Sequence, residues 1–131
     1  MIIDCHTHIG LESFIVKEIP AWKRAKPAFA VRMENRPETL LAAMDESGVD
    51  KAVIFPFPLE EEDSDAANKY VLNSALTFPD RFLPFALLDP EPDVWIERGA
   101  LGFKQHFLLA PERFELTGIY RTLEEHQVPL I

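Results

Sequence analysis

The sequence holds one cysteine, Cys5, which excludes an intrachain disulfide and fits a reducing compartment. It has no apolar run of membrane-spanning length, and no basic-then-apolar leader precedes the first apolar segment. Cations are scarce, with 13 Lys and Arg against 22 Asp and Glu and a formal net charge of −9. This balance argues against a nucleic-acid surface and favours small-molecule or protein partners. We therefore expect a cytoplasmic protein that binds neither nucleic acid nor membrane.

Hydrophobic residues make up 47% of the 131 residues, enough to bury a core, and we expect one domain over residues 1–131. Apolar runs predict strands that end at His8 and cover residues 51–55, 82–88 and 101–106, with a fifth beginning at 128–131. Between them, helices are predicted from Pro37 to Gly48, over residues 67–78, briefly within 90–98, and over 116–123. This alternation predicts an α/β fold with a parallel sheet and right-handed crossovers.

The segment Asp4-Cys5-His6-Thr7-His8 carries the clearest signal for chemistry. Side chains alternate along a strand, so Asp4, His6 and His8 are predicted to share one face. Two imidazoles at the carboxyl end of one strand then converge on a point, as the first two nitrogen ligands of a metal ion do. A pair of histidines hydrogen-bonded in a core is the alternative, and the spacing favours metal ligation.

An apolar strand leading into Asp-x-His-x-His resembles the start of the amidohydrolase superfamily, and more narrowly its amidohydrolase-related branch of aromatic-acid decarboxylases and lactone hydrolases. Residues 44–53, 78–82 with 89–90, and 102–104 extend the resemblance over essentially the whole chain. It implies a (β/α)8 TIM barrel in which His6 and His8 hold a divalent metal, with zinc the expected ion. Asp4 would then act behind the ligands, by accepting a hydrogen bond or by packing beneath the metal.

A complete (β/α)8 barrel takes about 250 residues. The chain therefore corresponds to about the first four βα units and the start of strand five. Such a half barrel leaves apolar strand edges with unpaired backbone groups near residues 2–3 and 128–131, and these invite pairing. We expect a fragment of a longer protein. The alternative is a homo-oligomer in which two copies cover the open edges.

Four further residues are candidates for binding the substrate. Lys104 and His106 are spaced by two in the fourth predicted strand. Lys104 would present a cation to the substrate or serve the structure alone; His106 would orient substrate, transfer a proton or fill the barrel. Arg24 and Trp22 belong to a long stretch, residues 11–36, that would form a lid over a carboxylate-bearing substrate or a solvated loop.

The resemblance implies hydrolysis of an amide or ester, or non-oxidative loss of CO2, on a small substrate that contains a carboxylate or carbonyl group. The expected general base is an aspartate on strand eight, beyond residue 131, so the 131 residues alone are expected to be inactive. A non-catalytic fragment that binds metal weakly or not at all is the alternative. A histidinol-phosphatase-like phosphoesterase also begins with His-x-His, but residues 55–58 (Phe-Pro-Phe-Pro) stand where that group carries an Asp-His pair.

Overall fold

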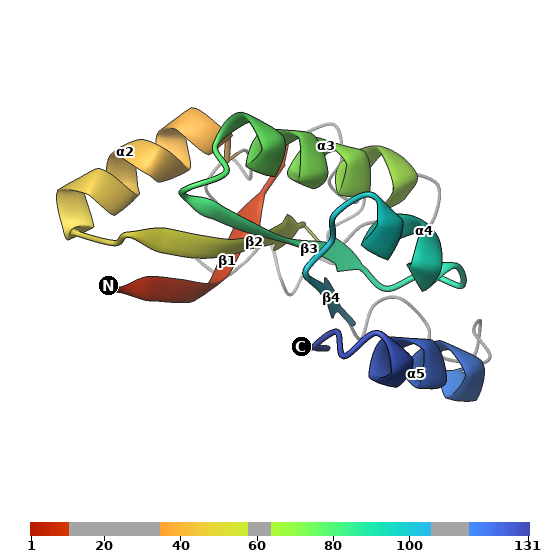
Figure 1. Cartoon of the computed structure of the whole chain (residues 1–131). Coiled ribbons are helices and arrows are strands. Elements are labelled where there is room, and N and C mark those ends of the chain that lie inside the picture. The colour runs from red at the N-terminus through yellow and green to blue at the C-terminus, as the bar shows by residue number, and fades with distance from the viewer. Residues whose placement is uncertain (11–34, 58–63, 106–115) are drawn as a thin grey trace, which may run out of the picture.

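A computed structural model describes residues 1–10, 35–57, 64–105 and 116–131. Over these residues strands and helices alternate along the chain (Figure 1). The strands are β1 (Ile3–Ile9), β2 (Lys51–Pro56), β3 (Phe82–Leu87) and β4 (Gly102–Lys104). The helices are α2 (Pro37–Ser47), α3 (Ser64–Thr77), α4 (Pro92–Glu97) and α5 (Leu116–Glu125). Every helix in the described part of the chain is too short or too polar to span a bilayer.

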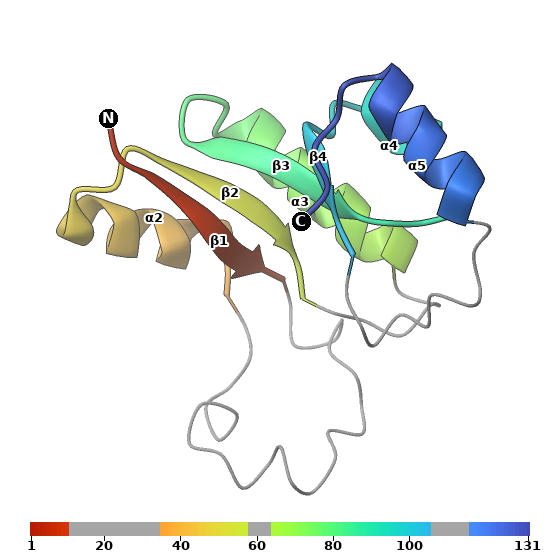
Figure 2. The same ribbon diagram turned by 90° about the horizontal axis from the view of Figure 1, so that it is seen from below.

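The strands form a single sheet in the order β1-β2-β3-β4, and each neighbouring pair is parallel, as the alternation predicts (Figure 2). The side chains of β2 divide the core between the two faces of this sheet. Ala52 and Ile54 pack with residues of α2 and α3, whereas Val53 and Phe55 pack on the opposite face with Phe85 of β3. In a barrel this second face is the interior.

Local signals set the ends of α2. Pro37 occupies the first turn, where the missing N–H is not needed, and Gly48 ends the helix with φ of 70°. In α5, Ile119 and Leu123 are buried, whereas Tyr120 is 41% exposed and its hydroxyl donates to Gln105 Oε1 at 3.1 Å.

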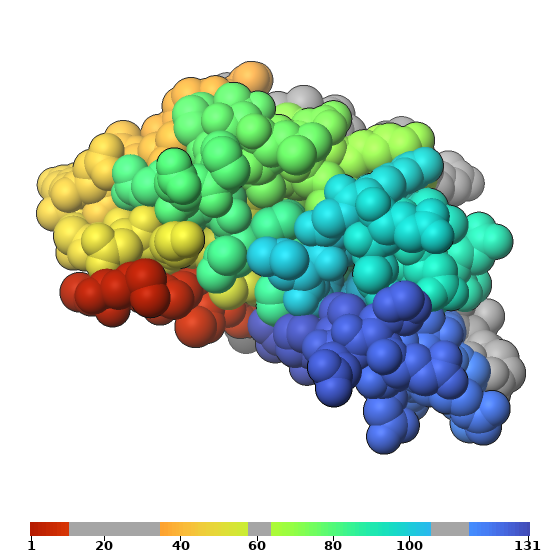
Figure 3. Space-filling view, in the orientation of Figure 1, coloured from red at the N-terminus to blue at the C-terminus, as the bar shows by residue number. Residues whose placement is uncertain are grey.

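The two edges of the sheet differ. Beside β4, the C-terminal segment makes a parallel bridge between Leu130 and Phe103, and the N–H of Ile131 donates to the Phe103 carbonyl at 2.9 Å. This is the position predicted for the start of strand five. At the other edge, Met1 and Ile2 are 90% and 58% exposed, and β1 runs along the surface of the molecule (Figure 3).

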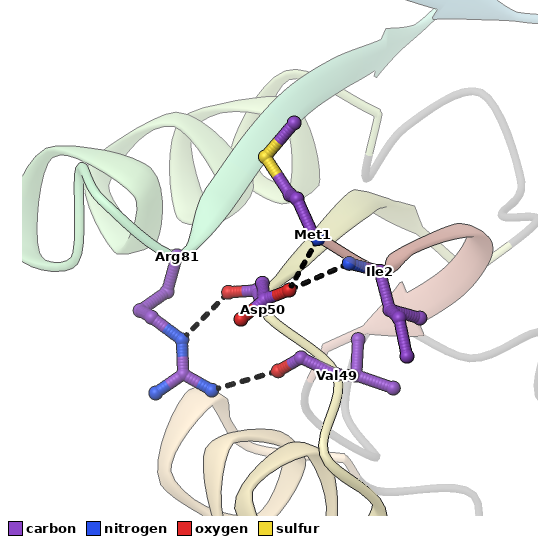
Figure 4. A network of polar contacts seen from close by, with 5 residues as sticks. All are labelled: Met1, Ile2, Val49, Asp50 and Arg81. Atoms are coloured by element: carbon purple, nitrogen blue, oxygen red, sulfur yellow. Dashed lines mark hydrogen bonds and ion pairs between the residues drawn. The ribbon is translucent and has the colours of Figure 1, made fainter.

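A polar network ties the amino ends of the strands together (Figure 4). The Asp50 carboxylate accepts a hydrogen bond from the Ile2 N–H at 2.6 Å and lies 3.7 Å from the Met1 amino group. Arg81, just before β3, donates to the carbonyls of Asp50 and Val49 at 2.9 and 3.2 Å. The hydrogen bond from Ile2, with the nearby positive charges, lowers the pKa of Asp50 below its ordinary value.

We expect Asp50→Asn to lower the melting temperature by a few degrees at pH 7. Because the pKa of Asp50 is depressed in the folded chain, its stabilisation is present above the unfolded-state value of 3.8 and is lost as the pH falls through the folded value. The difference between variant and wild type should therefore shrink as the pH falls below 3.8. Thermal unfolding from pH 7 down to about pH 2 measures this, with Asp80→Asn as the exposed control. A difference that persists at low pH contradicts the assignment.

Gly102 is required where β4 passes Phe85. These two residues are partners in the β3–β4 ladder, and a Cβ at residue 102 would overlap the ring of Phe85, which is buried. We expect Gly102→Ala to cost about 1–3 kcal/mol of unfolding free energy by overpacking. Urea unfolding of Gly102→Ala, Phe85→Leu and the double variant measures the coupling between the two sites. If the effects of the two substitutions simply add, the Phe85 ring is not the reason why residue 102 must be glycine.

Candidate metal-binding site

The register of β1 on β2 decides which residues of β1 share a face. Asp4 pairs with Ala52, but His8 pairs with Phe55, because one extra residue of β1 is accommodated between Asp4 and Thr7. Such a shift moves side chains to the other face of a sheet. The prediction that Asp4 shares a face with His8 is therefore wrong. Asp4 nevertheless accepts a hydrogen bond, from the backbone N–H of His6 at 3.0 Å.

The imidazoles of His6 and His8 lie together over Phe55, a side chain of β2 with no exposed surface. Their ring centres are 5.4 Å apart, and they lie 4.9 and 4.5 Å from the centre of the Phe55 ring. The planes of the two imidazoles make angles of 88° and 87° with the plane of the Phe55 ring, so both contacts are T-shaped. The buried aromatic ring thus holds the two imidazoles on the interior face, at the carboxyl end of the sheet.

A hydrogen bond orients the ring of His8. Its Nδ1 lies 2.8 Å from the carbonyl oxygen of Pro56. A carbonyl only accepts, so Nδ1 carries the proton and Nε2 holds the lone pair of the neutral ring. Metal-ligating histidines are usually fixed in this way, with one ring nitrogen bonded to a carbonyl or carboxylate and the other directed at the ion. Phe57 stacks on the same ring, with centres 5.5 Å apart and planes 7° from parallel.

The spacing of the two rings fits a shared ion. With a metal–nitrogen distance of about 2.0 Å and a ring nitrogen about 1.2 Å from the ring centre, two imidazoles on a tetrahedral zinc would have centres roughly 5.2 Å apart. The observed separation is 5.4 Å. Within residues 1–10, 35–57, 64–105 and 116–131, no three His, Cys, Asp or Glu side chains form a group that could hold a metal ion. In the described part of the chain, His6 and His8 are the candidates for two of the ligands that such a site would need.

Lys104 reaches the same place from β4. Its Nζ lies 5.2 Å from the centre of the Phe55 ring, which brings a cation, an apolar ring and two imidazoles together. Arg24, Trp22 and His106 lie outside the described residues, so their predicted roles stay predictions. His126, by contrast, is surface exposed and pairs with Asp93 at 3.0 Å.

Sequence reasoning missed three members of the site, Phe55, Pro56 and Phe57. The signal was present: these residues follow β2 directly, at the carboxyl edge of the sheet where parallel α/β folds place their sites. Reading them only as the end of a strand overlooked the rings that flank His8 and the carbonyl that orients it.

The fold is that of about the first four βα units of a (β/α)8 barrel, with the start of a fifth strand. Several solved structures are similar to it, and two of them are described here. One is 4-oxalomesaconate hydratase from Rhodopseudomonas palustris, with a TM-score of 0.62 and 19% identity over 99% of this chain and 51% of that one. The other is a probable 2-pyrone-4,6-dicarboxylic acid hydrolase from Acinetobacter baumannii with citric acid bound, with a TM-score of 0.56 and 18% identity over 79% of this chain and 36% of that one.

The chain thus spans about half of the first structure and about a third of the second. At identities of 18% and 19%, the likeness shows the fold alone. No family model matches the chain, and no curated protein matches it.

We expect His6→Ala and His8→Ala each to weaken binding of Zn2+ or Co2+ by more than about tenfold, because each removes a nitrogen ligand. Isothermal titration with Zn2+, and the visible spectrum of the Co2+ form, measure this in the full chain. His126→Ala is the matched control, since this histidine is exposed and pairs with Asp93. Equal affinity in the His6, His8 and His126 variants would show that the pair does not bind the ion.

Proposed function

We propose that this chain provides the metal-binding start of a metal-dependent hydrolase of the amidohydrolase-related type, which acts on a small carboxylate-bearing substrate. One observation carries the proposal: two imidazoles, one of them oriented by a backbone carbonyl, share a buried aromatic ring with a lysine cation. His6 and His8 would hold the ion. When bound, the ion would supply Lewis acidity, which polarises a carbonyl group toward attack by water.

The chain's own residues do three things in this proposal. The Pro56 carbonyl keeps the proton of His8 on Nδ1, so that Nε2 is the nitrogen that would ligate the ion. Phe55 and Phe57 provide apolar surface beside His8, which lowers the local dielectric constant and strengthens electrostatic interactions there. Lys104 offers a positive charge to the substrate carboxylate.

The names of the two similar structures support a carboxylate-bearing substrate. One is called a hydrolase of a dicarboxylic acid and was solved with citric acid bound, and the other is called a hydratase. Both names describe addition of water. They favour hydrolysis or a related water addition over loss of CO2 as the reaction proposed for this chain.

Citrate binding to the zinc-loaded chain tests the assignment of Lys104. Lys104→Met keeps the apolar stem and removes the charge, so we expect the dissociation constant for citrate to rise about tenfold. Lys69→Met is the control, because Lys69 is an exposed cation on α3 that pairs with Asp65. Isothermal titration measures both variants. If Lys104→Met binds citrate as the wild type does, Lys104 is not the carboxylate site.

A further inference from the structure

A buried side-chain amide completes the main-chain hydrogen bonds of β3. Asn68, on α3, has no exposed surface. Its Nδ2 donates to the carbonyl of Leu87 at 3.2 Å, and its Oδ1 accepts from the N–H of Leu87 at 2.7 Å. One carboxamide therefore pairs with both polar groups of a single residue, as a neighbouring strand would.

The amide is needed because the β2–β3 ladder ends early. That ladder runs from Ala52 and Phe82 to Ile54 and Pro84, while β3 continues to Leu87. On the other side, Leu88 donates its N–H to the Lys104 carbonyl at 2.9 Å, so the polar groups of Leu87 face away from β4, toward β2. Asn68 thus takes the place of β2 beside the end of β3.

Leu87 touches both halves of the site. It is the ladder partner of Lys104, whose ammonium lies over the Phe55 ring. Its side chain also packs in a cluster with Ala67 and Phe57, and Phe57 stacks on the imidazole of His8. A displacement of Leu87 would consequently move the cation and the metal-ligand ring together.

We infer that Asn68 is a positioning residue: by holding the main chain of Leu87, it sets the placement of Lys104 and of His8 relative to each other. The inference rests on the proposed function for its consequence, which is binding of metal and carboxylate at this place. Its geometry can be tested without any ligand.

The test is the NMR spectrum of the full chain with Asn68→Ala. In the wild type, we expect the Phe55 ring to shift the methylene protons next to Lys104 Nζ, and the stacked Phe57 to shift the His8 ring protons. In the variant we expect both sets to lose at least half of that shift, and the zinc dissociation constant to rise about tenfold, as when a supporting partner of a ligand is removed. Asn73→Ala, an exposed asparagine on the same helix, should change neither.

A purely structural role gives a different result and overturns the inference: a lower melting temperature with both sets of shifts and the zinc affinity unchanged well below that temperature. Leu87 acts on His8 through Phe57 and on Lys104 through the β3–β4 ladder. Phe57→Leu should therefore move the His8 signals and leave those of Lys104 in place. If it moves both sets equally, Leu87 does not act on the two residues through separate contacts, and the inference is overturned.

Should Asn68→Ala fail to fold, hydrogen exchange in the wild type decides. The Leu87 amide and the Asn68 side-chain amide are expected to exchange slowly, and fast exchange of either in the folded chain overturns the inference. If the wild type does not bind zinc, the result counts against the proposed function. The NMR shifts would still test whether Asn68 sets the positions of Lys104 and His8.

Discussion

Parallel pairing of β1 with β2 is the constraint on which the candidate site depends. It brings His8 opposite Phe55 and within 2.8 Å of the Pro56 carbonyl, across 48 residues of sequence. The extra residue accommodated within β1 turns Asp4 to the other face, while ring contacts keep His6 beside His8. A different register would separate the imidazoles from the aromatic ring that holds them.

The sheet is anchored differently at its two ends. At the amino end, exposed charges join three strands, with Asp50 holding the first residues of the chain and Arg81 capping the carbonyls that lead into β2. At the carboxyl end, one buried amide stands in for a strand that has already diverged. Exposed charge pairs stabilise weakly and are screened by salt, whereas a buried, fully satisfied amide imposes one geometry. The buried Asn68 amide, which restricts the geometry more than the exposed charges do, lies at the carboxyl end of the sheet, where the candidate metal-binding site is.

Much of the fold could be predicted because its signals are local. Pro37 and Gly48 bound a helix through their own backbone preferences, and the apolar run of β2 is typical of a strand buried on both faces. The His6–His8 pair was predicted from strand alternation. Two long-range features could not be predicted: the shift within β1 and the aromatic surroundings of His8 depend on contacts that no local pattern encodes.

By itself, the sequence determined the alternation of strands and helices, the parallel sheet and the placing of two imidazoles near the end of the first strand. These follow from residue periodicity and from the stereochemistry of proline and glycine, which act within a few residues. Only the tertiary structure decided which nitrogen of His8 carries the proton, which rings enclose it, and that a buried amide on α3 holds the main chain beside Lys104. Those features arise where segments distant in sequence pair and pack, and their geometry exists only once the sheet has formed.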